Sequence, residues 1–144
     1  MYEEDLEVII SEEIAKIPER VVLKHLLIES GTNRVPTATV ELVIDGQEVK
    51  QTGSGDGPVD AVYRTIAAMT TTKSRLLTYT VKAITGGTDA QGEVSVRLQE
   101  NGRTVTGHGA DTDIIVASAR AYLNALNKLA FWTAKQATQR DGLI

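Results

Sequence analysis

Cysteine is absent from this chain of 144 residues, and histidine and aromatic residues are scarce. Without cysteine the chain can form no disulfide, no thiolate nucleophile and no cysteine-based metal site. His25 and His108 are its two histidines, too few for a histidine-built metal centre. Its four Tyr, one Trp and one Phe are also too few for a platform on which nucleic-acid bases stack.

The chain also lacks a basic surplus and a long apolar run. Its formal net charge is −4 and its isoelectric point is about 5.2, which argues against a nucleic-acid partner held through phosphate contacts. No apolar run approaches the roughly 20 residues of a membrane helix, and no signal-peptide pattern is visible. We therefore expect one cytoplasmic domain with neither a membrane nor a nucleic acid as its partner.

The first pattern along the chain is an acidic, amphipathic stretch over residues 3–16. Leu6 and Ile14 belong to its apolar stripe, and Pro18 ends it. This pattern predicts a short helix, and we interpret residues 1–18 as a linker with a helical lead-in to the domain.

Residues 19–144 show the same order of elements twice. Each half contains a hairpin signal, Asp45-Gly46 in the first and Asn101-Gly102 in the second, and each ends in an amphipathic helix. The expected strands are 21–30, 36–44, 47–52, 76–85, 93–98 and 103–106, and the expected helices are about 58–71 and 112–139. The sequence thus predicts an α+β domain of two βββα units, about 20–72 and 75–139, related by a pseudo-two-fold axis.

Apolar side chains mark the buried face of each predicted helix and of the fourth strand. The stripe of the first helix comprises Val59, Val62, Tyr63, Ile66 and Ala67. The stripe of the second helix comprises Ile114, Ser118, Ala121, Tyr122, Ala125 and Leu129. The fourth strand is expected to place on one face Leu77, Tyr79, Val81 and Ala83.

Two glycine-rich segments join a strand to a helix, at residues 52–60 and 106–113. Glycines permit a sharp turn and the close approach of another group. In the first segment Asp56 is the predicted N-cap, and Pro58 suits the first helical turn. The free N–H groups and the positive dipole at a helix start favour an anion. The repetition of the segment indicates a duplicated unit.

Carboxylates in or near these segments could supply a general acid–base pair, together with His108. They are Asp56, Asp60, Asp89, Asp111 and Asp113. The sequence nevertheless contains no Ser/His/Asp order, no HExxH spacing and no nucleophile elbow. Because aspartate at a helix start more often caps the helix, a small free-standing enzyme is the weakest interpretation.

The anion at the first segment could be a phosphate or a carboxylate. Residues 53–57 lack the GK[ST] ending of a P-loop, and their aspartate would repel phosphate. A zwitterion fits better, because helix-start N–H groups can bind its carboxylate while nearby aspartates bind its ammonium group. Val59, Ala83, Ala90 and Ile114 could enclose an apolar side chain. This pattern points to a small amino acid as the ligand.

Four longer motifs resemble the C-terminal regulatory domain of the 2-isopropylmalate synthase family. They are Gly-Asp-Gly-Pro-Val-Asp-Ala at 55–61, Tyr-Thr-Val-Lys-Ala-Ile-Thr-Gly-Gly-Thr-Asp-Ala-Gln-Gly at 79–92, Asp-Thr-Asp-Ile-Ile-Val-Ala-Ser-Ala at 111–119 and Ala-Tyr-Leu-Asn-Ala-Leu-Asn-Lys at 121–128. The resemblance extends from about Val21 to Leu129 with its motifs in order. It is therefore far more specific than one glycine turn.

The resemblance implies a leucine-sensing domain that dimerises with its own copy and feedback-inhibits a separate catalytic barrel. That barrel condenses acetyl-CoA with 2-oxoisovalerate using a divalent metal, and none of its motifs occurs here. This chain is thus expected to bind no cofactor and to be non-catalytic by itself, as a fragment of an acyltransferase. Its expected partners are L-leucine, a second copy and the barrel.

The leucine-binding residues that the resemblance implies come from both units. They are Gly55, Gly57, Val59, Asp60, Tyr79, Ala83, Asp89, Ala90, Gln91, Asp111, Asp113 and Ile114. Two alternatives stay open, since the related regulatory domain of citramalate synthase responds to isoleucine, and a dimerisation module could have lost its ligand altogether.

Overall fold

The structure is a computed structural model that describes residues 19–84 and 91–143. The predicted linker at residues 1–18, with its helix, lies outside these ranges. The elements in chain order are β1 (Val21–Gly31), β2 (Arg34–Ile44), β3 (Gln47–Ser54), α2 (Pro58–Thr70), β4 (Arg75–Ile84), β5 (Gln91–Glu100), β6 (Arg103–Asp111) and α3 (Ile114–Leu143). This order confirms the predicted α+β fold of two βββα units.

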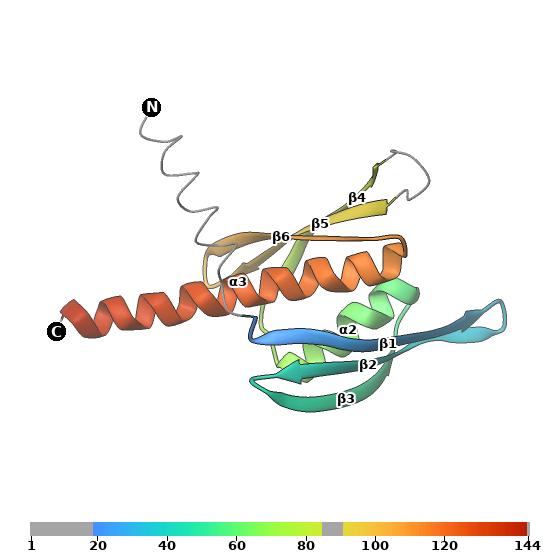
Figure 1. Cartoon of the computed structure of the whole chain (residues 1–144), viewed down its shortest axis with the longest axis horizontal. Helices are drawn as coiled ribbons and strands as arrows, with labels where there is room; N and C mark the ends of the chain where they lie inside the picture. The colour runs from blue at the N-terminus through green and yellow to red at the C-terminus, as the bar shows by residue number, and fades with distance from the viewer. Residues whose placement is uncertain (1–18, 85–90, 144) are drawn as a thin grey trace.

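The two helices lie between two three-stranded antiparallel sheets (Figure 1). The strand orders are β1-β2-β3 and β4-β5-β6. Helix α2 packs on β2 and β3, whereas α3 packs on β5 and β6 and also reaches across to β1. One hydrophobic core therefore fills the space between the sheets, with Val40, Leu42, Val96 and Leu98 fully buried on its two sides.

Both predicted hairpin turns are confirmed. Asp45 and Gly46 connect β2 to β3 with φ angles of 51° and 82°, and Asn101 and Gly102 connect β5 to β6 with 52° and 78°. Two successive positive φ angles are typical of a type I′ turn, whose twist matches that of the flanking strands. The Asp-Gly and Asn-Gly pairs are thus the local signals that set the registers of both hairpins.

The first two strands of each unit pair in the same way. Leu23 lies opposite Leu42 in the first unit, as Leu76 lies opposite Leu98 in the second, and one extra residue follows in each outer strand. In β4 that extra residue is Leu77. The prediction that Leu77 shares the inner face with Tyr79, Val81 and Ala83 is therefore wrong, because the bulge gives this inner position to Leu76.

The glycine pairs lie at the ends of strands beneath the helices. Gly107 and Gly109 belong to β6, so the predicted turn over residues 106–113 is mostly strand. A Cβ atom on Gly109 would lie 2.4 Å from a carbonyl oxygen of α3, and one on Gly55 would lie 2.5 Å from a backbone nitrogen of α2. These glycines allow each helix backbone to approach its own sheet closely.

The helix predictions need small corrections at the ends. Helix α2 has the predicted start, whereas α3 begins at Ile114 because Asp113 caps it. The predicted stripes face the core, with Val62, Ile66 and Ser118 fully buried. Within the described residues, neither helix is long and apolar enough to cross a membrane.

Candidate ligand site at the two helix starts

The start of α2 is organised by Asp60. Gly57 is the N-cap in an extended conformation and makes no side-chain cap. Asp60 Oδ2 instead accepts the N–H of Asp56 at 2.8 Å and pairs with Arg64 Nε at 2.9 Å. The prediction of Asp56 as the N-cap is wrong because the helix begins one residue later, whereas Pro58 does lie in the first turn.

The carboxylate of Asp60 is held in its ionised form. The N–H of Asp56 and the Arg64 guanidinium keep the pKa of Asp60 below its usual range. A negative charge at this position also complements the positive end of the helix dipole. The contacts of Asp60 therefore stabilise the first turn of α2.

The start of α3 uses two of the predicted aspartates. Asp113 Oδ1 accepts the N–H of Ile115 at 2.8 Å, as an N-cap does. Asp111 Oδ1 accepts the N–H of Asp113 at 2.9 Å, and its Oδ2 lies 3.8 Å from Arg120 Nε. Both side chains thus serve the helix start, and contact with a ligand's ammonium group stays a prediction for them and for Asp60.

The two helix starts lie at the same end of the molecule (Figure 1). Beside these starts, Tyr63 of α2 and Tyr79 of β4 both form hydrogen bonds with Ser118 of α3. The Tyr63 hydroxyl donates to the Ser118 carbonyl at 3.0 Å. Ser118 Oγ donates to the Ile114 carbonyl at 2.7 Å, so its lone pair accepts the Tyr79 hydroxyl at 2.7 Å. This network joins α2, α3 and β4 through one buried residue.

Tyr63 is the central ring of an aromatic cluster. It stacks on Tyr122 with a centroid distance of 4.5 Å and meets Tyr79 edge-on at 6.1 Å. Burial raises the pKa of Tyr63 and that of Tyr122 above their usual range. Both hydroxyls therefore stay protonated at neutral pH and can act as hydrogen-bond donors beside an apolar wall.

The second unit brings several predicted site residues together around Gly92. Ala83 and Asp111 flank Gly92 on the neighbouring strands. The Ile114 side chain covers Gly92 so closely that an added Cβ would lie 1.9 Å from its Cδ1. Gln91 is the adjacent residue at the exposed start of β5. Residues from three separate parts of the sequence are thus neighbours at this end of the sheet.

The remaining predicted residues differ in their surroundings. Gly55 faces the backbone of α2 itself, whereas a Cβ on Gly57 would meet no atom within 4 Å. Val59 is half-buried against the core. Asp89 and Ala90 lie outside the described residues. Of the two glycines, Gly57 is therefore the one with room for a ligand to approach.

Sequence reasoning missed the parts played by Ser118, Tyr63 and Gly92. The first two were expected only as members of apolar helix stripes. A polar residue on such a stripe is the signal that could have identified them, because a buried hydroxyl needs a partner. Gly92 has no comparable signal, since only the packing of Ile114 shows why a side chain is excluded there.

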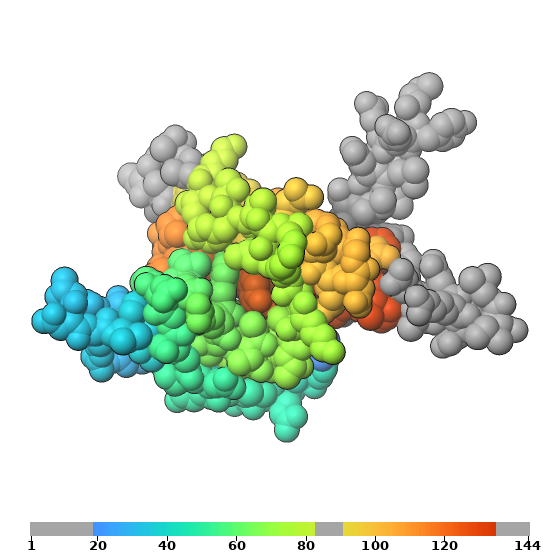
Figure 2. Space-filling view, turned by 180° about the vertical axis from the view of Figure 1, so that it is seen from behind, coloured from blue at the N-terminus to red at the C-terminus, as the bar shows by residue number. Residues whose placement is uncertain are grey.

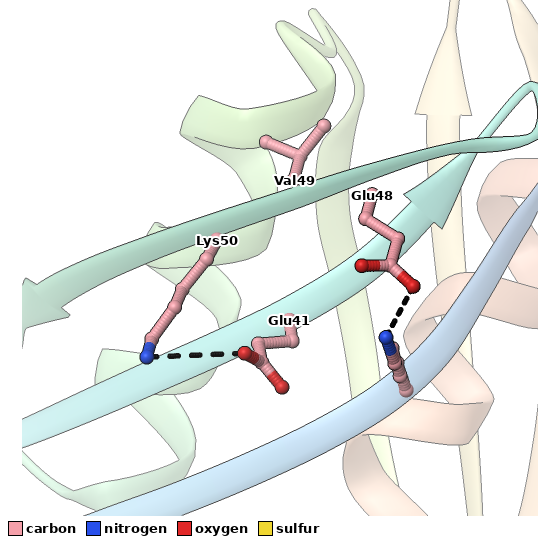
Figure 3. Close-up of a pocket in the computed structure, with 5 residues that line it drawn as sticks. Glu41, Glu48, Val49 and Lys50 are labelled. Atoms are coloured by element: carbon pink, nitrogen blue, oxygen red, sulfur yellow. Dashed lines mark hydrogen bonds and ion pairs between the residues drawn. The ribbon is translucent and has the colours of Figure 1, made fainter.

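A hollow of about 190 Å³ lies on the first sheet and is lined mainly by charged side chains (Figure 3). Lys24 pairs with Glu48, and Lys50 Nζ lies 3.8 Å from Glu41 Oε1. These cross-strand pairs stand on the sheet face away from α2, opposite the buried Leu42. With its charges already paired and only Val49 as an apolar lining residue, this hollow does not suit an apolar amino acid.

Comparison with known proteins gives one family over most of the chain. The family described as "LeuA allosteric (dimerisation) domain" matches residues 1–130. Among curated proteins, a 2-isopropylmalate synthase of Syntrophus aciditrophicus is 52% identical over 131 residues, which cover 91% of this chain and 25% of that protein. Proteins of the same name from Heliobacterium modesticaldum and Gloeobacter violaceus are 52% and 50% identical, with 90% and 88% of this chain and 25% and 24% of theirs covered.

This chain thus spans about a quarter of the length of these relatives. Among solved structures, a solution structure of both dsRBDs of DRB4 with their linker aligns with 88% of this chain and 92% of that chain. Its sequence identity is 13% and its TM-score is 0.28, values too low to inform fold or function.

Proposed function

Because the chain belongs to the LeuA allosteric (dimerisation) domain family, we propose that it binds L-leucine and thereby regulates a 2-isopropylmalate synthase. The observation that carries this proposal is the identity of about half the residues with synthases of that name over some nine-tenths of the chain. In this proposal leucine is the end product whose binding inhibits a catalytic barrel beyond this chain.

The chemistry of the helix starts supports an amino acid as the effector. Two helix N-termini at one end of the molecule favour a carboxylate. The aliphatic side chains of Val59 and Ile114 belong to the first turn of each helix and are half-buried. The hydroxyl of Tyr79 forms a hydrogen bond with Ser118, one turn after Ile114 on α3. The apolar side chain and the carboxylate of an amino acid could therefore both be bound at this end of the molecule.

Calorimetric titration of the chain with leucine, isoleucine and valine tests the proposal directly. We expect leucine to bind most tightly and to raise the melting temperature. Tighter binding of isoleucine would favour the citramalate synthase type of regulation, since one methyl position is worth about 1–3 kcal/mol. If none of the three amino acids produces heat or a thermal shift, the proposal of leucine binding is wrong, and a dimerisation module without a ligand becomes the better interpretation.

The placement of the ligand at the first helix start is tested by Gly57→Ala. Gly57 has an extended φ of −156° and no atom near an added Cβ, so the variant should fold like the wild type. We expect leucine affinity to fall by roughly tenfold or more, about 1.4 kcal/mol. Gly31→Ala is the matched control, because an added Cβ there also meets nothing and Gly31 lies at the end of β1. Equal affinities of the two variants would remove Gly57 from the site.

Inhibition of the parent synthase needs its two states to bind leucine differently. We propose that the homodimer of this domain conveys that difference to the barrel, where the acyl transfer and its divalent metal would reside. Loss of leucine inhibition with retained synthase activity is the expected result of Gly57→Ala in the complete enzyme.

A further inference from the structure

The inner side of β4 is apolar but largely uncovered. Leu76, Tyr79 and Val81 lie opposite Leu98, Val96 and Val94, which are all fully buried. The three β4 residues are nevertheless 41%, 37% and 45% exposed. Neither helix extends over β4 as α3 extends over β5 and β6. An apolar surface continuous with the core is thus left open to solvent.

Figure 2 shows this side of the molecule, where α3 is visible in orange-red among the green and yellow-green residues of α2 and β4. The hydrogen bond between the hydroxyls of Tyr79 and Ser118 joins β4 to α3. The site residue Tyr79 therefore belongs both to the network at the helix starts and to the uncovered strand.

The edge of β4 also lacks the usual protection. From Leu76 to Val81 the strand contains neither a charged residue nor a proline, and its bulge residue Leu77 is exposed and apolar. Natural proteins protect exposed edges with charges, prolines or a covering element, because an open edge pairs with other strands. Strand β3 carries Glu48 and Lys50, for example, whereas the charged residues of β4, Arg75 and Lys82, lie outside the stretch from Leu76 to Val81.

We propose that a second copy of this chain covers β4. The family description names dimerisation, and two-fold dimers use one self-complementary patch on both subunits. The stretch from Leu76 to Val81 meets this requirement, because it contains no charged residue and so brings no like charges together when it faces its own copy. The assignment rests on dimerisation as part of the proposed function and is independent of which amino acid binds.

The test compares Val81→Lys with Val22→Lys by analytical ultracentrifugation over a range of concentrations. Val22 is also an exposed valine of an outer strand, 37% exposed, but it lies opposite Val43 on the outer face of the first sheet. We expect a wild-type dimer, a dissociation constant raised roughly 100-fold or more by Val81→Lys, and little effect of Val22→Lys. A monomeric wild type, or an unchanged dimer of Val81→Lys, would overturn the proposal.

Cross-linking keeps the test decisive if Val81→Lys does not fold by circular dichroism. Since the chain contains no cysteine, a single Val81→Cys or Val22→Cys provides one reactive position. A short thiol-specific cross-linker should produce covalent dimers of Val81→Cys and not of Val22→Cys. The reverse pattern, or equal cross-linking, would contradict the proposed surface.

Leucine titration of the same samples separates the two proposals. A dimer that depends on β4 but binds neither leucine, isoleucine nor valine would support the dimer surface and contradict leucine binding. A chain that binds leucine and whose dimer is unaffected by Val81→Lys would support leucine binding and contradict the dimer surface.

Discussion

Strands β1 and β4 occupy the same place in the two units, yet one is covered and the other is open. The inner residues Leu23 and Leu26 of β1 pack against the core, whereas Leu76 and Tyr79 of β4 remain substantially exposed. The extra residue of the bulge differs as well, since Lys24 pairs with Glu48 while Leu77 is apolar and exposed. Two units with one topology thus present different edges.

The lengths of the two helices account for this difference. Helix α2 ends at Thr70, whereas α3 continues to Leu143 and reaches β1 on its way. On that continuation, Asn127 accepts the Val21 N–H at 2.9 Å and donates to the Val21 carbonyl at 3.0 Å. Just before β4, the Thr72 hydroxyl accepts the N–H of Ser74 and Glu100 Oε1 accepts that of Lys73, and neither acceptor belongs to α2. A repeated unit can therefore acquire an asymmetric surface through the length of one helix.

The largest effect is expected where α3 lies on its own sheet. In Gly107→Ala the new Cβ would lie 2.2 Å from the Ala121 carbonyl oxygen and 2.7 Å from the Ala125 nitrogen, both backbone atoms. We expect the free energy of unfolding to fall by about 3 kcal/mol, measured by urea denaturation.

Gly53→Ala is the comparison in the first unit, where the close contact is 2.4 Å from the Thr65 hydroxyl, a side-chain atom. A smaller loss of about 1–2 kcal/mol is expected there, because a side chain adjusts more easily than a helix backbone. A larger loss in Gly53→Ala than in Gly107→Ala would reverse the ranking of the two helix–sheet contacts.

Removing the hydrogen bonds between Asn127 of α3 and Val21 of β1 should leave β1 less firmly held to α3, as β4 is. Asn127→Ala leaves the N–H and C=O of Val21 without this partner in a buried place, so we expect a loss of roughly 2–3 kcal/mol in urea denaturation. Hydrogen exchange at the Val21 amide should accelerate as well.

Asn124→Ala is the matched control one helical turn earlier. Its side chain accepts one N–H, that of His108, at an exposed position, and about 1 kcal/mol is expected from its loss. Equal losses for Asn124→Ala and Asn127→Ala would mean that Asn127 does not fasten β1.

The smallest effect concerns the two helix starts. Asp60→Asn removes the charge that faces Arg64, whereas Asp113→Asn retains a good N-cap. We expect a loss of about 0.5–1 kcal/mol for Asp60→Asn and almost none for Asp113→Asn at neutral pH.

The pH dependence identifies the charge as the cause. The pKa of Asp60 is lowered in the folded protein, so its carboxylate stabilises the fold above the unfolded pKa. This contribution is lost as the pH falls through the folded pKa. The free energies of unfolding of the wild type and Asp60→Asn, measured by urea denaturation, should therefore converge in acid. A difference that persists at low pH would mean that the effect comes from side-chain geometry and not from charge.

Much of the fold is predictable because its signals are local. The Asp45-Gly46 and Asn101-Gly102 turns, the alternation in the strands and the helix stripes each act within a few residues of sequence. The errors are local too. Asp56 and Gly57 compete for one capping position, and the bulge at Leu77 shifts the inner face of β4 by one residue.

The candidate site was predictable only in part. The aspartates at the helix starts and the apolar residues Val59 and Ile114 were found from their neighbours in sequence. Tertiary packing brings Tyr63, Tyr79 and Ser118 together, and the spacing of these residues in the sequence does not predict their hydrogen bonds. Whether leucine contacts the predicted residues stays a prediction.

The duplicated βββα order and the two hairpin turns can be derived from the amino-acid sequence, because they depend on local backbone conformation and on the spacing of apolar residues. The packing of each helix on its glycines, and the choice of the outer strand that is covered, depend on tertiary structure. Asn127 and Val21 are 106 positions apart, and only the path of α3 across the molecule brings them together. The same path leaves β4 open, which the amino acids of β4 could not reveal without their surroundings.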